Sequence, residues 1–171
     1  MRQIFLDTET TGFGADDRII EIAALSYENY QPREDGIFHQ YCNPQCGVST
    51  GALNVHGMDN DFLADKPLFA DIADDLQAFL RGSEVIIHNA SFDCRFLDSE
   101  FSRLAMPPMT AITDQVVCSL TLSRQRYPTL GGHSLTNLCR CFGIDDSDRT
   151  AHGALVDARL LAQVYFAMGR K

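Results

Sequence analysis

Three strand-like segments occupy the first part of the chain, at residues 2–8, 19–27 and 37–42, and only short connections separate them. Strands joined so closely pair antiparallel, because a parallel pair needs a crossover of a dozen or more residues. This arrangement constrains the fold strongly. It requires a sheet whose N-terminal strands are antiparallel, onto which the rest of the chain must pack.

The rest of the chain alternates between helical and strand-like patterns. In the segment 67–81, apolar residues recur with the period of a helix, and residues 44–65 read as a loop with a short helical turn. The expected helices are residues 67–81, 91–104, 115–126, 134–142 and 151–168, and the further expected strands are residues 84–88 and 112–114. This order predicts an α/β fold with a mixed sheet flanked by helices.

The length and composition limit the class of protein. A chain of 171 residues predicts one domain, residues 1–171. The apolar runs are only as long as strands, and no basic-then-apolar leader opens the chain, so we expect a cytoplasmic protein without a membrane span. No CxxC pair occurs, which favours reduced thiols over a zinc site or disulfides. The six cysteines are Cys42, Cys46, Cys94, Cys118, Cys139 and Cys141.

The net charge of the chain is −9, from 23 acidic and 14 basic residues. Tight non-specific binding of nucleic acid needs clustered lysines and arginines, so this charge argues against a free-standing binder of that kind. It remains compatible with an enzyme that handles phosphates through a divalent cation.

Two acidic residues end the first expected strand. Asp7 and Glu9 are two positions apart, so their side chains point to the same face of that strand. The carboxyl end of a strand is where α/β sheets place ligands. The alternative is that both are solvated charges at a fraying strand end.

Two further acids share the apolar face of a helix. Asp93 aligns with Phe96 and Leu97, and Asp157 aligns with Leu161 and other apolar residues of the last helix. A buried carboxylate needs a cation or hydrogen-bond donors. The alternative for Asp93 is a favourable interaction with the helix dipole.

His152 stands at the entrance of the last helix, beside a glycine, and taken alone it could be an ordinary polar residue. Four acids that meet would form a site for hard cations, Mg²⁺ or Mn²⁺. Two such ions build a phosphoryl-transfer site, and a neutral histidine at its rim can take a proton from water.

Three segments resemble the motifs of the DEDDh 3′→5′ exonucleases: residues 5–12 (FLDTETTG), 87–93 (IHNASFD) and 152–157 (HGALVD). Further similarity at residues 55–57, 62–67 and 149–155 makes the chain most like the members that proofread for a bacterial replicative polymerase. The resemblance implies a ribonuclease-H-like fold with a five-stranded mixed sheet flanked by helices. The single domain would then be an exonuclease domain.

The resemblance also implies roles for individual residues. Asp7, Glu9 and Asp157 would hold metal directly, Asp93 would act through bound water, and His152 would be the general base. The terminal nucleotide would be bound by Asp7, Glu9, Thr10, His56, Asn89 and Phe92, with His88 in a supporting role. The family often has a glutamate where this chain has Gly51, which puts one nucleotide contact in doubt.

The implied function is removal of mispaired nucleotides from DNA 3′ ends as 5′-monophosphates during replication, with two Mg²⁺ or Mn²⁺ ions. The implied partners are DNA 3′ ends, the catalytic subunit of a bacterial replicative polymerase and a small accessory subunit of its core. Two alternatives remain open. One is an RNA-processing member of the same superfamily, and the other is a non-catalytic module that stabilises a polymerase.

Overall fold

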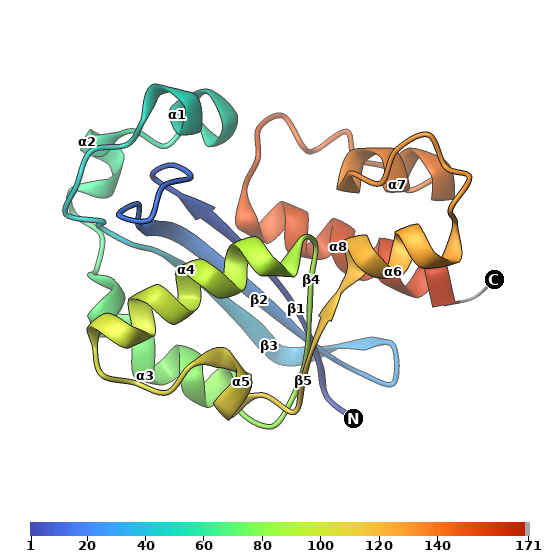
Figure 1. Cartoon of the computed structure of the whole chain (residues 1–171), viewed down its shortest axis with the longest axis horizontal. Coiled ribbons are helices and arrows are strands. Elements are labelled where there is room, and N and C mark those ends of the chain that lie inside the picture. Colours follow the sequence, from blue (N-terminus) through green and yellow to red (C-terminus); the bar gives the residue numbers. More distant parts are fainter. Residues whose placement is uncertain (170–171) are drawn as a thin grey trace.

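The computed structural model describes residues 1–169 and is built around one mixed sheet (Figure 1). The strand order is β3-β2-β1-β4-β5, in which β1, β2 and β3 are antiparallel and β4 and β5 run parallel to β1. The strands are β1 (Gln3–Thr10), β2 (Ile19–Glu28), β3 (Gln31–Tyr41), β4 (Glu84–Ile87) and β5 (Gln115–Cys118). The predicted α/β fold with a five-stranded mixed sheet is confirmed.

Helices cover both faces of this sheet. Because side chains alternate along a strand, Ile4 and Leu6 pack with α3, α4 and α5 on one face, whereas Phe5 packs with α7 and α8 on the other. The helices are α1 (Thr50–His56), α2 (Asn60–Leu63), α3 (Phe69–Leu80), α4 (Ala90–Arg103), α5 (Met109–Ile112), α6 (Ser119–Arg126), α7 (Leu135–Phe142) and α8 (Ala154–Gly169).

The fifth strand was predicted in the wrong place. The segment 112–114 is not a strand, because Ile112 ends α5 and is buried in the core as a helical residue. The strand is β5, which pairs with β4 from Glu84↔Gln115 to Ile87↔Cys118. The helix expected over residues 115–126 therefore begins only at Ser119.

The third strand is longer than predicted. It begins at Gln31 rather than at residue 37, although its first five residues are exposed and include Pro32, and a buried glycine, Gly36, follows them. This sequence is tolerated because β3 lies at the edge of the sheet, where a proline removes no necessary ladder hydrogen bond. Residues 44–65, read as a loop with one helical turn, contain two short helices, α1 and α2.

Two expectations about the chain as a whole can be compared with the structure. All six cysteines are free. Within residues 1–169, no helix combines the length and apolar character needed to cross a membrane. The predicted single domain includes residues 170 and 171, which lie outside the described residues.

Candidate active site

The carboxyl end of β1 carries the first two candidate acids. Asp7 and Glu9 project from the same face of the strand, as their spacing predicts. Glu9 pairs with Glu21 of β2, and a bulge follows between Glu9 and Thr10. Glu9 is only 9% exposed, so its carboxylate lies at the inner wall of the site.

Asp93 reaches the same place from the first turn of α4. Its Oδ1 accepts hydrogen bonds from the backbone N–H of Thr8 at 3.1 Å and from the Thr8 hydroxyl at 2.8 Å. Asn89, with a left-handed φ of 64°, makes the turn from β4 into α4. This turn and the two bonds from Thr8 hold the buried Asp93 carboxyl beside β1.

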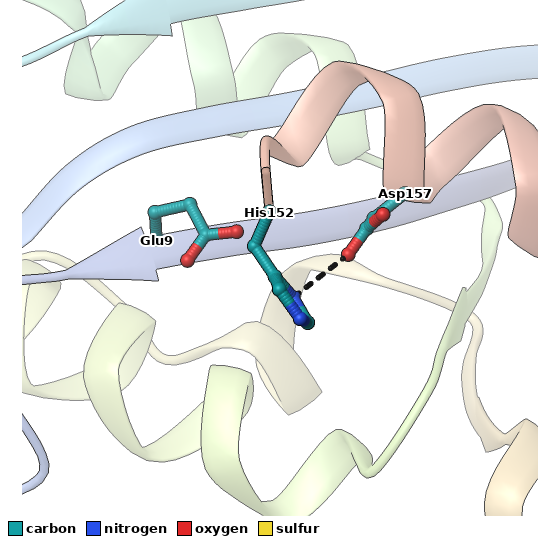
Figure 2. A group of neighbouring side chains, drawn as sticks. All are labelled: Glu9, His152 and Asp157. Atoms are coloured by element: carbon teal, nitrogen blue, oxygen red, sulfur yellow. Dashed lines mark ion pairs between the residues drawn. The ribbon is translucent and has the colours of Figure 1, made fainter. Parts of the chain in front are cut away.

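Asp157 and His152 come from the start of α8 and the loop before it. Figure 2 shows their side chains together with that of Glu9, and one ligand atom from each of the three lies within 4.8 Å of the others. His152 Nδ1 is 3.3 Å from Asp157 Oδ2. His152 lies beside the entrance of α8, as expected, but the helix begins at Ala154 rather than at residue 151, and the backbone N–H of His152 donates to the carbonyl of Val55 at 3.1 Å.

Arg149 is a member of this site that the sequence analysis did not assign. Its guanidinium makes two bonds to the Asp157 carboxylate, of 2.5 and 2.6 Å, and donates to His152 Nδ1 at 2.9 Å. It also donates to the Thr136 hydroxyl at 2.6 Å. The available signal was an arginine three residues before His152 in a chain that has few basic residues.

The pKa values of three acids at this site, Asp7, Glu9 and Asp93, are raised, with burial as the largest cause. Burial, with the nearby Asp157 carboxylate as the next cause, raises the pKa of Glu9 to about 8, and burial raises that of Asp93 to about 7. The pKa of Asp7 lies well above its usual range, because the group is desolvated and faces the other carboxyls. Arg149 opposes this effect at Asp7 and Glu9. Among the described residues, the four carboxyls thus outnumber the one guanidinium, that of Arg149, that contacts them.

This donor set fits divalent cations. Hard ions such as Mg²⁺ and Mn²⁺ take carboxylate oxygens, and a cavity lined by four carboxyls is a place where a cation relieves repulsion. One positive group, the Arg149 guanidinium, already lies against Asp157. The residues present therefore suit the metal centre expected from the sequence.

All nine residues assigned to catalysis, metal or substrate line one cavity of about 410 Å³, here called the first cavity. The nine are Asp7, Glu9, Thr10, His56, Asn89, Phe92, Asp93, His152 and Asp157. Phe13 also lines it, and its ring lies 5.9 Å from that of Phe92. The first cavity is thus lined by both acidic and aromatic side chains.

His56 is buried and uses both ring nitrogens within the protein. Nδ1 accepts the backbone N–H of Met58 at 3.0 Å, so the proton is on Nε2, which donates to the carbonyl of Thr10 at 3.2 Å. Burial lowers the pKa of His56. Its ring is therefore a neutral wall of the first cavity.

Two supporting residues became interpretable only in the structure. His88 bonds the Ser119 hydroxyl at 2.9 Å and the backbone of His133, and so ties β4 to α6 and to the segment before α7. Glu21, whose role the sequence left undecided, accepts the N–H of Ala154 at 3.0 Å and bonds His39 at 2.7 Å. Glu21 therefore fixes the start of α8.

A mixed sheet that brings four carboxyls and a histidine to one cavity is the arrangement expected of a metal-dependent phosphoryl-transfer enzyme. Comparison with known proteins identifies the kind. Residues 4–165 match the family model described as Exonuclease, and the chain belongs to this family.

The similarity extends to individual relatives. The chain is 46% identical over 174 residues to the DNA polymerase III subunit epsilon of Salmonella typhimurium, covering 98% of this chain and 71% of that protein. It is 45% identical to the same subunit of Escherichia coli, with the same coverage. The predictions of an exonuclease and of the epsilon-subunit type are confirmed.

Solved structures agree with the fold. Escherichia coli exonuclease I in complex with a dA16 oligonucleotide superposes with a TM-score of 0.87 at 19% identity, over 99% of this chain and 41% of that one. Exonuclease X in complex with duplex DNA gives 0.74 at 22% identity, over 98% and 91% of the two chains. Similarity at this level of identity supports the fold.

Proposed function

We propose that this exonuclease removes mispaired nucleotides from DNA 3′ ends and releases them as 5′-monophosphates, as the proofreading subunit of DNA polymerase III. The observation that carries the proposal is the meeting of Asp7, Glu9, Asp93, Asp157 and His152 at one cavity. The high identity to epsilon subunits supports the choice of substrate and of setting.

The proposed cofactors are two divalent ions, Mg²⁺ or Mn²⁺. Asp7, Glu9 and Asp157 would hold metal directly, Asp7 would bridge the two ions, and Asp93 would act through bound water. When bound, such ions supply activated water and charge stabilisation of the leaving oxygen. Carboxylate ligands favour these hard ions over softer ones.

His152 is the proposed general base. A proton on Nδ1 can be donated to Asp157 Oδ2, which lies 3.3 Å away, and Nε2 is then free to take the proton of water. Arg149, which donates to the same Nδ1, favours the opposite tautomer. In the active state Arg149 must therefore release His152.

The first cavity is the proposed site of the terminal nucleotide. Phe92 and Phe13 offer aromatic surface for stacking, and Thr10, His56 and Asn89 line the same space. This arrangement supports a bound state in which the nucleotide base lies beside the aromatic rings and its 5′-phosphate beside the acids. A Cβ at Gly51 of α1 would meet open space, so crowding does not exclude the glutamate that the family often has at this position.

The test measures cleavage of 3′-labelled single-stranded DNA and RNA oligonucleotides of the same sequence, with Mg²⁺ and with Mn²⁺. Asp7→Asn is expected to lower the rate on DNA by ~100-fold or more, because a carboxylate ligand is lost. Asp74→Asn, an exposed acid of α3, is the control. Undiminished activity of Asp7→Asn contradicts the site, and strong RNA preference of the wild type favours an RNA-processing role.

The proposed partners are DNA 3′ ends, the DNA polymerase III alpha subunit and a small accessory subunit of the polymerase core, in the bacterial cytoplasm. Residues 1–171 are proposed to form the single exonuclease domain of this assembly. Co-purification of the chain with the alpha subunit supports this setting, and its failure to bind that subunit at micromolar concentration contradicts it.

A further inference from the structure

A second cavity, of about 710 Å³, adjoins the first cavity. The two share Asp7, His88, Asn89, His152 and Asp157, so two of the candidate metal ligands, Asp7 and Asp157, lie at the boundary between them. The second cavity extends away from this boundary toward α6 and α7, which lie with α8 on one side of the sheet (Figure 1). The candidate catalytic centre is therefore open to two spaces.

The two cavities differ in charge. No lysine or arginine lines the first cavity. The second is lined by Arg124 of α6 and by Arg149, together with His133 and Thr136. In a chain of net charge −9 with only 14 lysines and arginines, two arginines in one cavity next to a carboxylate cluster are an unusual concentration of positive charge.

The two arginines are not equivalent. Arg149 is bonded to Asp157, His152 and Thr136, and so is engaged at the boundary. Arg124 is exposed, and no other group among residues 1–169 forms a hydrogen bond or ion pair with its guanidinium. An unpaired guanidinium at the wall of a cavity is available to a ligand, and phosphate is a ligand whose geometry it matches.

When a phosphodiester is cut at the boundary between the cavities, the released 3′-terminal nucleotide lies on one side of the bond and the remaining strand on the other. If the 3′-terminal nucleotide occupies the aromatic first cavity, the strand that remains must leave through the other space. The first group on that side that carries a full negative charge is the next phosphate, on the 5′ side of the penultimate nucleoside. We propose that the second cavity binds this phosphate and that Arg124 is its ligand. The proposal rests on the proposed function and adds a subsite to it.

If the second cavity binds this phosphate, kcat/KM should depend on whether a dinucleotide substrate carries it. The dinucleotide d(TpT) has only the bond to be cut, whereas 5′-phosphorylated d(pTpT) also carries the phosphate that the second cavity would bind. The wild-type enzyme is expected to show a higher kcat/KM on d(pTpT), by about tenfold, because a charge-assisted contact of about 1.4 kcal/mol corresponds to that factor.

The experiment compares kcat/KM on d(pTpT) and d(TpT) for the wild type, Arg124→Gln, Arg124→Lys and Arg140→Gln with Mn²⁺. Arg124→Gln is expected to lose the preference for d(pTpT) and to hydrolyse d(TpT) within twofold of the wild type, which also shows that it is folded. Arg124→Lys keeps the charge and should retain part of the preference. Arg140→Gln, an exposed arginine of α7 outside the cavity, should leave the preference unchanged.

The outcomes separate the two proposals. An equal effect of Arg124→Gln on both dinucleotides, or no effect on either, overturns the subsite and leaves the exonuclease intact. The same loss of preference in Arg140→Gln also overturns it, because the effect would then come from overall charge. If the wild type hydrolyses neither the two dinucleotides nor longer DNA strands, the proposed function is overturned, and the subsite with it.

Discussion

Thr8 is a small side chain with a large influence on the site, because it gives two hydrogen bonds to the buried Asp93. Thr8→Val keeps the shape but removes the hydroxyl donor, and Asp93 is left with one bond fewer. We expect a loss of about 1–3 kcal/mol in the free energy of unfolding and weaker Mn²⁺ binding. Urea denaturation and calorimetric titration measure the two effects. Thr8→Ser keeps the donor and should behave like the wild type, and equal behaviour of the two variants would contradict this role.

In the protein without metal, the Arg149 guanidinium is the positively charged group that contacts the Asp157 carboxylate. Arg149→Gln removes a competitor for that carboxylate and leaves the four acids with more net negative charge. We expect Mn²⁺ to bind several-fold more tightly to this variant without DNA, and its thermal stability in EDTA to fall. Titration calorimetry with Arg140→Gln as the charge-matched control tests this. Weaker Mn²⁺ binding to Arg149→Gln would show that Arg149 supports the metal site instead.

The sequence allowed the five candidate catalytic residues to be predicted, but not the groups that hold them. Asp7, Glu9, Asp93, His152 and Asp157 stand in motifs whose spacing and resemblance point to a site, and the structure brings them together. Thr8 lies within the first motif and Arg149 within a segment of further similarity, but the sequence does not show which carboxylate either one contacts, because a donor to a carboxylate is defined by distance in space. Their partners lie in α4 and α8, and only the packing of those helices against β1 shows the contact.

At the scale of elements, the start of α8 depends on β2. Glu21 accepts the N–H of Ala154, the first residue of the helix, and so steadies the loop that carries His152. Glu21→Ala leaves that N–H and His39 without their partner, and we expect it to lower the free energy of unfolding by about 2–3 kcal/mol and to lower kcat. Glu21→Gln keeps an oxygen acceptor and should lose much less. Denaturation curves and rates on single-stranded DNA compare the two variants, and an equal loss in both would mean that the charge of Glu21 matters rather than the bond.

The elements themselves were predictable to different degrees. Long periodic segments such as α3 and α4 lie within two residues of their predicted ends. The region 109–118 was predicted wrongly, because α5 and β5 have four residues each, too few for a period to show. The adjacent β-branched Val116 and Val117 were the local sign of a strand, but pairing with β4 decides the register.

At the scale of the whole molecule, the clustered acids link stability to pH. Glu9 and Asp93 have pKa values of about 8 and about 7 in the folded protein, against ordinary values of 4.5 and 3.8. At a pH between the ordinary and the raised pKa values, the folded state therefore binds more protons than the unfolded state. The free energy of unfolding must then fall as the pH rises through the pKa values of the folded protein. The pKa values of buried His56 and half-buried His88 are lowered, so these two groups act in the opposite direction only below their ordinary value of 6.5.

The metal-free protein should accordingly become less stable between pH 7 and 8.5. In EDTA we expect the Tm to fall by about 2–5 °C over this range, on the scale of a few degrees per kcal/mol for a domain of this size. Mg²⁺ or Mn²⁺ binds the ionised carboxylates, so the metal should raise the Tm more at pH 8.5 than at pH 7. Glu9→Gln lacks one titrating group and should show a flatter dependence. Scanning calorimetry on both proteins, with and without metal, decides the matter, because a wild-type Tm that rises in EDTA over this range is incompatible with acids whose pKa values are raised by folding.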